Sequence, residues 1–88
     1  MGIATPLIVR VLTPEYKKVV VETNEGLRYH SDLSLLEKVY CFPKSKAEWD
    51  QVSPDSFGSA LVWTSRLEAH IDQIIGLATK VEKIAASA

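Results

Sequence analysis

Residues 16–31, YKKVVVETNEGLRYHS, decide the fold of this chain. The β-branched run in the first half predicts a strand in which Val19 and Val21 point to one face. The Asn-Glu-Gly segment that ends at Gly26 is typical of a tight turn, because glycine adopts a positive φ without strain. The remaining residues return as a second strand. The stretch therefore predicts an antiparallel hairpin.

Two more strands are expected outside this hairpin. Residues 7–13 are rich in Val, Ile and Leu, and the proline that follows cannot donate to a sheet ladder. Residues 56–63 place Phe57, Leu61 and Trp63 on one face, and Gly58 indicates a bulge or a close backbone approach. Together these segments predict an antiparallel sheet of three or four strands.

Two short helices, or one broken helix, are predicted between the hairpin and the last of these strands. Ser34 with Glu37, and Ser45 with Glu48, have the spacing of a capping box, in which the serine oxygen accepts from an early helical N–H. A proline follows each segment and ends it. The aromatic residues recur at the spacing of buried faces, so we expect Trp49 and Trp63 to anchor the core rather than to stack on nucleic-acid bases.

The last third of the chain predicts one long amphipathic helix over residues 66–85. It opens with a third capping box, Ser65 with Glu68, and continues with apolar residues at helical spacing. These residues are Leu67, Ile71, Ile74, Ile75, Ala78, Val81 and Ala85.

This helix is expected to be longer than the sheet beneath it. Twenty helical residues span about 30 Å, whereas strands of seven residues span about 23 Å. The overhang would expose apolar side chains, and exposed apolar surface usually marks a protein interface. A break at Gly76 is the alternative, because glycine weakens a helix interior. The predicted homodimer interface comprises Leu67, Ile71, Ile74, Ile75, Leu77, Val81 and Ile84.

The expected architecture is therefore a single α+β domain over residues 1–88. A β-rich part, residues 7–64, carries the small antiparallel sheet of three or four strands and the two short helices. Residues 65–85 form the long C-terminal helix. A chain of 88 residues has a thin core, so a second copy would add useful burial.

Charge and composition narrow the classes of partner. The net charge is −1 and no run of Lys or Arg occurs, which argues against nucleic-acid binding. No apolar stretch approaches the roughly 20 residues that cross a bilayer. The single cysteine, Cys41, suits a reducing compartment, and we expect a cytoplasmic protein.

The sequence contains no motif of a named chemistry. It has neither a Gly-x-Ser-x-Gly elbow nor a glycine-rich phosphate loop. Cys41, His30 and His70 are too few for a zinc site. A Cys41–His30–Asp32 arrangement would require three separate accidents of geometry. We therefore predict no catalytic residue, metal or cofactor, and we keep a small enzymatic or ligand-binding domain around His30 and Cys41 as an alternative.

One bacterial family resembles residues 7–64 of this chain, namely the domain of unknown function 2442. The resemblance is carried by residues 16–21, the turn at 24–26, Tyr29, Asp32, Leu33, Trp49, Val52, Asp55, Gly58 and residues 61–63. It implies a small domain with a β-hairpin and short helices, and an adaptor or antitoxin-like role beside another bacterial protein. After Trp63 the chain departs from the family pattern.

These observations favour a non-enzymatic protein-interaction or regulatory module. We expect it to self-associate as a homodimer through its C-terminal helix. An antitoxin-like or adaptor partner of another bacterial protein is the alternative that the family resemblance implies.

Overall fold

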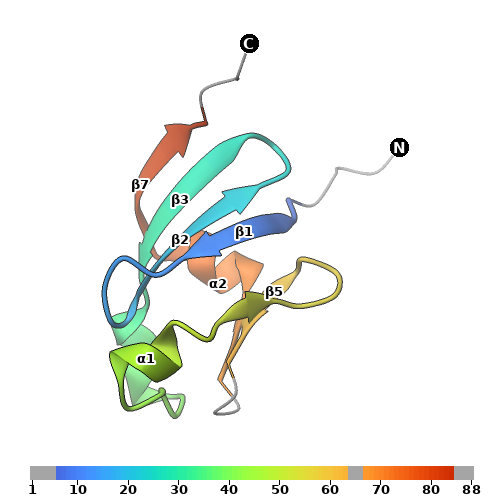
Figure 1. The fold of residues 1–88 in the computed structure, drawn as a ribbon. Helices are drawn as coiled ribbons and strands as arrows, with labels where there is room; N and C mark the ends of the chain where they lie inside the picture. The colour runs from blue at the N-terminus through green and yellow to red at the C-terminus, as the bar shows by residue number, and fades with distance from the viewer. Residues whose placement is uncertain (1–5, 64–66, 85–88) are drawn as a thin grey trace.

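The chain folds as two small antiparallel sheets that share one hydrophobic core (Figure 1). The computed structural model describes residues 6–63 and 67–84. The four-stranded sheet has the order β1-β2-β3-β7, and the three-stranded sheet has the order β4-β5-β6. In chain order the elements are β1 (Ile8–Leu12), β2 (Lys18–Thr23), β3 (Leu27–Asp32), the 3-10 helix η1 (Leu33–Lys38), α1 (Lys46–Trp49), β4 (Ser53–Pro54), β5 (Ala60–Val62), β6 (Glu68–His70), α2 (Ile71–Gly76) and β7 (Ala78–Lys83).

The predicted hairpin is confirmed. Strands β2 and β3 pair antiparallel, with Val21 opposite Tyr29. Gly26 closes the turn with φ +78° and donates its N–H to the Thr23 carbonyl at 3.1 Å. A side chain at this position would be strained, which is why the turn requires glycine.

The predicted long C-terminal helix is wrong, and with it the α+β class built on that helix. Strand is the main secondary structure of the described residues, and the longest helices there, η1 and α2, have six residues each. The segment from Leu67 onward forms β6, then α2, then β7. The expected helix start at 65–66 and its end at Ala85 lie outside the described residues.

Tertiary pairing explains this correction. The β6 strand pairs with β5 along its length, with Leu61 opposite Ala69. α2 begins only after His70, whose backbone N–H donates to the Gln73 side chain at 3.1 Å. The helix ends at Gly76, a weak helix former. The residues beyond it pair with β3, so the helical spacing of the apolar residues continued past the point where the helix stopped.

The predicted strand over residues 56–63 is shorter than expected. Only Ala60–Val62 is strand, because Asp55 folds the preceding residues into a turn. Its carboxylate accepts from the backbone N–H of Phe57 (3.2 Å) and of Ser59 (2.8 Å), and from the Ser59 hydroxyl (2.9 Å). Phe57 is thereby carried out of the predicted buried face and is 78% exposed.

Gly58 makes the close backbone approach that its position predicted. Its φ is +72°, and a Cβ atom there would lie 2.9 Å from the Ile8 carbonyl oxygen. The Gly58 carbonyl accepts the Ile8 N–H at 2.7 Å. The turn is thereby bound to the outer edge of β1.

Both predicted short helices exist, with one change of cap. Ser45 caps α1 as expected, its hydroxyl accepting the Glu48 N–H at 3.2 Å. The first helix is a 3-10 helix that begins two residues earlier than predicted, and its cap is Asp32, which accepts the Ser34 N–H at 3.0 Å. Hydrogen bonding from Ser34 lowers the pKa of Asp32 below its usual value of 3.8.

Two tryptophans join the sheets, as the sequence predicted. Trp49 and Trp63 are both buried, with ring centroids 4.6 Å apart. Trp49 Nε1 donates to the Lys18 carbonyl at 3.0 Å, which ties α1 to β2. Trp63 Nε1 donates to the Trp49 carbonyl at 2.9 Å. Every polar atom of the pair's indole rings is therefore satisfied inside the core.

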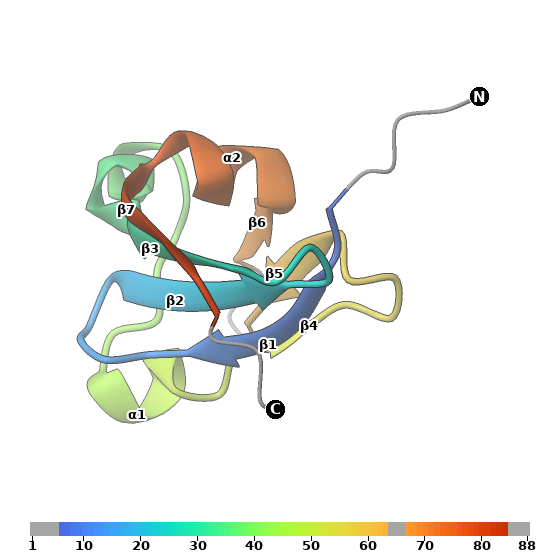
Figure 2. The same ribbon diagram turned by 90° about the horizontal axis from the view of Figure 1, so that it is seen from above.

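The four-stranded sheet has one covered and one open face (Figure 2). α2 packs against the covered face, where the buried Ser31 hydroxyl donates to the Ile74 carbonyl at 2.6 Å. Val19 and Val21 belong to this core. The alternate residues of the same strand, Lys18, Val20 and Glu22, point to the open face, on which Lys18 is exposed and Val20 and Glu22 are buried.

Candidate functional site

The strand β7 forms one edge of the four-stranded sheet (Figure 1). It pairs antiparallel with β3, with Tyr29 opposite Val81 and His30 opposite Lys80. The register shifts between His30 and Ser31, where the Thr79 hydroxyl donates to the His30 carbonyl at 3.3 Å. Within residues 6–63 and 67–84, no strand pairs with the outer side of β7.

The register shows which backbone groups point out of this edge. Pairs in an antiparallel ladder alternate between those that exchange backbone hydrogen bonds and those that do not. The Ile84 N–H donates to the Gly26 carbonyl at 2.9 Å, so the hydrogen-bonded positions continue at Glu82 and Lys80. The N–H and C=O groups of Val81 and Lys83 therefore point away from β3, toward the free edge.

The side chains of β7 alternate in character along the strand. Val81 lies on the same side of the sheet as the core but does not belong to it, and its side chain is 53% exposed. Lys80 and Glu82 lie on the open face. An exposed strand edge with a half-exposed valine can accept another strand through main-chain hydrogen bonds.

A row of alternating charges crosses the open face from β1 to β7. Glu22 on β2 is buried and accepts from Arg28 on β3 at 2.9 Å. Arg10 on β1 lies 3.8 Å from the other Glu22 oxygen. On the far side, Arg28 lies 4.0 Å from Glu82 on β7. Each strand thus contributes one charge, and neighbouring charges have opposite signs.

Glu82 is the acceptor at the end of this row. His30 Nε2 bonds to its carboxylate, and Lys80 Nζ lies 3.8 Å from it. The hydrogen bond from His30, followed by the attraction of Lys80 and Arg28, lowers the pKa of Glu82 below its usual value of 4.5. Glu82 is therefore ionised at neutral pH.

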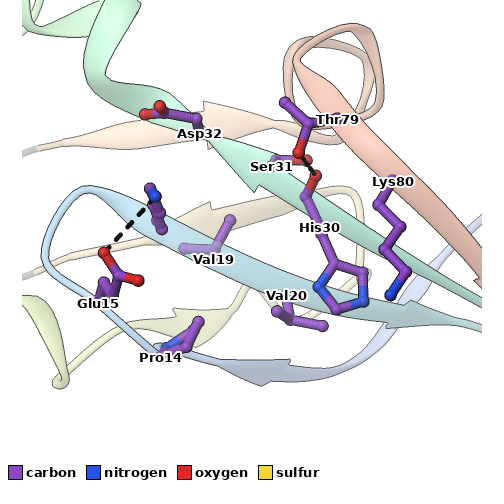
Figure 3. Close-up of a pocket in the computed structure, with 10 residues that line it drawn as sticks. Pro14, Glu15, Val19, Val20, His30, Ser31, Asp32, Thr79 and Lys80 are labelled. Carbon is purple, nitrogen blue, oxygen red and sulfur yellow. Dashed lines mark hydrogen bonds and ion pairs between the residues drawn. The ribbon is translucent and has the colours of Figure 1, made fainter.

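A shallow depression of about 380 Å³ lies beside the row on the open face (Figure 3). In this depression, the imidazole of His30 lies between the side chains of Val20 and Lys80. The lining residues are Pro14, Glu15, Lys18, Val19, Val20, His30, Ser31, Asp32, Thr79 and Lys80.

The depression lacks the parts of a nucleophilic site. Ser31 and Thr79 contribute the hydroxyl groups of the lining. The Ser31 hydroxyl donates to the Ile74 carbonyl on the opposite face, and the Thr79 hydroxyl donates to the His30 carbonyl. Asp32 is engaged as a helix cap, and His30 is bonded to Glu82. General-base activation requires a nucleophile within hydrogen-bond reach of the base. The lining shows no such pair.

Cys41, which the alternative hypothesis grouped with His30, does not line this depression, and neither does His70. Cys41 is free and exposed in the loop that follows η1. His70 ends β6 and is exposed at the start of α2. Among the described residues, no group of three His, Cys, Asp or Glu side chains is placed to hold a metal ion.

The seven residues predicted for the interface divide into three groups. Leu67, Ile71 and Ile74 are buried in the core of the chain itself. Ile75, Leu77 and Ile84 are half-buried, the first two of them against that core. Only Val81 is exposed.

Sequence reasoning missed the edge strand, although a signal was present. Thr79 and Val81 are β-branched, and they alternate with the charged residues Lys80 and Glu82. This period of two predicts a strand with one polar face. The stronger helical spacing that precedes it concealed the change of period at Gly76.

Comparison with known proteins returned no match among protein-family models, curated proteins or solved structures. The resemblance to the domain of unknown function 2442 thus stays a prediction. In the part of the chain that the structure describes, no helix has the length and apolar character needed to cross a membrane.

Proposed function

We propose that this chain is a non-enzymatic protein-interaction module that binds by strand addition at the free edge of β7. The observation that carries the proposal is the outward direction of the Val81 and Lys83 backbone groups, which find no partner among the described residues. An added strand would satisfy these groups and cover the exposed Val81 side chain.

The arrangement of side chains favours binding over catalysis. The charges of the open face neutralise one another in pairs, and the depression beside them pairs no nucleophile with a base. An adaptor or antitoxin-like role fits the same edge, because the partner in either role is another protein. The free, exposed Cys41 suits the cytoplasm, where we place the protein.

The test uses two proline substitutions one residue apart. Val81→Pro removes an N–H that points outward, and an edge strand tolerates proline there. Glu82→Pro removes an N–H that bonds to β3, so it should release β7 from the sheet. Each variant and the wild type serve as bait in a lysate of the source organism, with folding checked by circular dichroism.

We expect the Val81→Pro variant to keep the wild-type fold and to lose the wild type's bound protein. The Glu82→Pro variant should lose both the protein and part of the β signal. Retention of the same partner by folded Val81→Pro at wild-type level would exclude the β7 edge as the binding site.

A further inference from the structure

We infer that the strand added at β7 is β7 of a second copy, paired antiparallel about a two-fold axis at Val81. This inference rests on the proposed function and names its partner. It predicts a homodimer in which the two four-stranded sheets join into one continuous sheet. The contact differs from the helix-mediated dimer expected from the sequence, because it uses main-chain hydrogen bonds.

The direction of the backbone groups fits this axis. Val81 would face Val81 of the second copy, and both point their N–H and C=O groups outward. The two residues would therefore form a hydrogen-bonded pair, with Cα atoms about 5.5 Å apart. The two exposed valine side chains would lie side by side and cover each other.

The charges next to Val81 are self-complementary in this register. Lys80 and Glu82 flank it on the open face, so each Lys80 would lie opposite Glu82 of the second copy. Opposite charges in directly facing positions stabilise an antiparallel pair, and like charges destabilise it. The alternating row that runs through Glu22, Arg28 and Glu82 would thus continue into the second molecule with the correct sign.

Neighbouring registers lack this complementarity. Moving the axis to Lys80 would place the two Lys80 ammonium groups opposite each other, and moving it to Glu82 would do the same for two carboxylates. Lysines on an edge strand commonly prevent unwanted pairing. Here the pattern Lys80-Val81-Glu82 disfavours both symmetric registers adjacent to the one centred on Val81.

Disulfide trapping tests the register directly. In a Cys41→Ser background, Val81→Cys places the two thiols on the axis, within the Cα separation that a disulfide needs. Lys83→Cys is the matched control. Its thiols would be offset by four residues, or about 13 Å, which is too far to bridge. We expect rapid crosslinking under mild oxidation at position 81 and not at position 83.

Charge reversal tests the partner. Lys80→Glu and Glu82→Lys should each be monomeric alone by light scattering, because each places like charges across the axis. An equimolar mixture should form a heterodimer, since the acidic strand of one variant faces the basic strand of the other. The wild type should be dimeric. Circular dichroism checks Glu82→Lys, because Glu82 also contacts Arg28 and His30.

The outcomes separate this inference from the proposed function. A wild type that stays monomeric up to millimolar concentration, yet holds another protein in a Val81-dependent manner, would overturn the homodimer and leave strand addition intact. Crosslinking at position 83 rather than 81 would overturn the Val81 register. A dimer that crosslinks at neither position and survives Val81→Pro would overturn both. Crosslinking at 81 with heterodimer formation supports both.

Discussion

The two edges of the four-stranded sheet are treated differently by the rest of the chain. At the β1 edge, the pairing register shifts between Ile8 and Arg10, and the turn at Gly58 binds the Ile8 N–H. At the β7 edge, the described part of the chain adds nothing to the outer side of the strand. Unpaired edges are templates for pairing with another chain, and proteins usually block them. The difference is that the β1 edge is covered by a turn, whereas the outer side of β7 is left uncovered by the described residues.

The largest effect is expected from Trp49→Ala, which removes a large buried side chain from the core that the two sheets share. Trp49 is fully buried between the sheets and bonds to the Lys18 carbonyl. The loss should be about 3–5 kcal/mol of unfolding free energy, a large share of a small domain's stability. Urea denaturation measures it. A loss below that of an ordinary exposed substitution would show that the tryptophan pair does not join the sheets.

A smaller, local effect is expected from Gly58→Ala, which should open the β1 edge only. The added Cβ would meet the Ile8 carbonyl oxygen at 2.9 Å, in a backbone conformation that non-glycine residues avoid. We expect a destabilisation of about 1–3 kcal/mol. Amide hydrogen exchange should become faster at Ile8 and remain unchanged along β7. Equal acceleration at both edges would contradict the local role of the turn.

Gly76→Ala is the matched glycine substitution and should act in the opposite direction. Nothing lies within 4 Å of a Cβ placed there, and Gly76 has no positive φ. Alanine restricts the unfolded chain and favours the helix, so stability should rise by about 0.5–1 kcal/mol. The same urea series measures this change. A loss of stability would indicate that the end of α2 needs the flexibility of glycine.

The smallest effect is expected from lowering the pH, which should reduce the free energy of unfolding through one carboxyl group at each edge. His30 lowers the pKa of Glu82 at the β7 edge. At the β1 edge, partial burial raises the pKa of Asp55. The hydrogen bonds that its carboxylate accepts from Ser59 and Phe57 outweigh this effect, so the pKa of Asp55 lies below 3.8. A carboxyl with a lowered pKa in the folded state stabilises the fold above its unfolded pKa. That contribution is lost as the pH falls through the folded value.

Single amide substitutions should assign this acid loss to each edge. We expect Glu82→Gln and Asp55→Asn to show a shallower decline of unfolding free energy than the wild type below about pH 4.5, the region where these carboxyls titrate. Both groups are solvent-accessible, so each change should be modest. If either variant lost unfolding free energy with falling pH as steeply as the wild type, the carboxyl replaced in that variant would not contribute to the acid loss.

Local chemistry by itself determined part of this protein. The hairpin from β2 to β3 joins strands that are neighbours in sequence, and the turn at Gly26 specifies their register. The cap of α1 by Ser45 and the burial of Trp49 and Trp63 are also legible in the sequence. Each of these features depends on residue types and on neighbours in the sequence, so the sequence alone is enough to predict it.

Only the tertiary structure decided the last third of the chain. The apolar residues from Leu67 to Val81 fit a helical spacing, and a short helix does form at Ile71–Gly76. The strands on either side of it exist because β5 and β3 offer unpaired edges, and β3 lies some fifty residues earlier in sequence. Backbone hydrogen bonds to a distant strand outweighed a helical propensity that Gly76 had already weakened. The same pairing leaves the outer side of Val81 as the candidate binding edge.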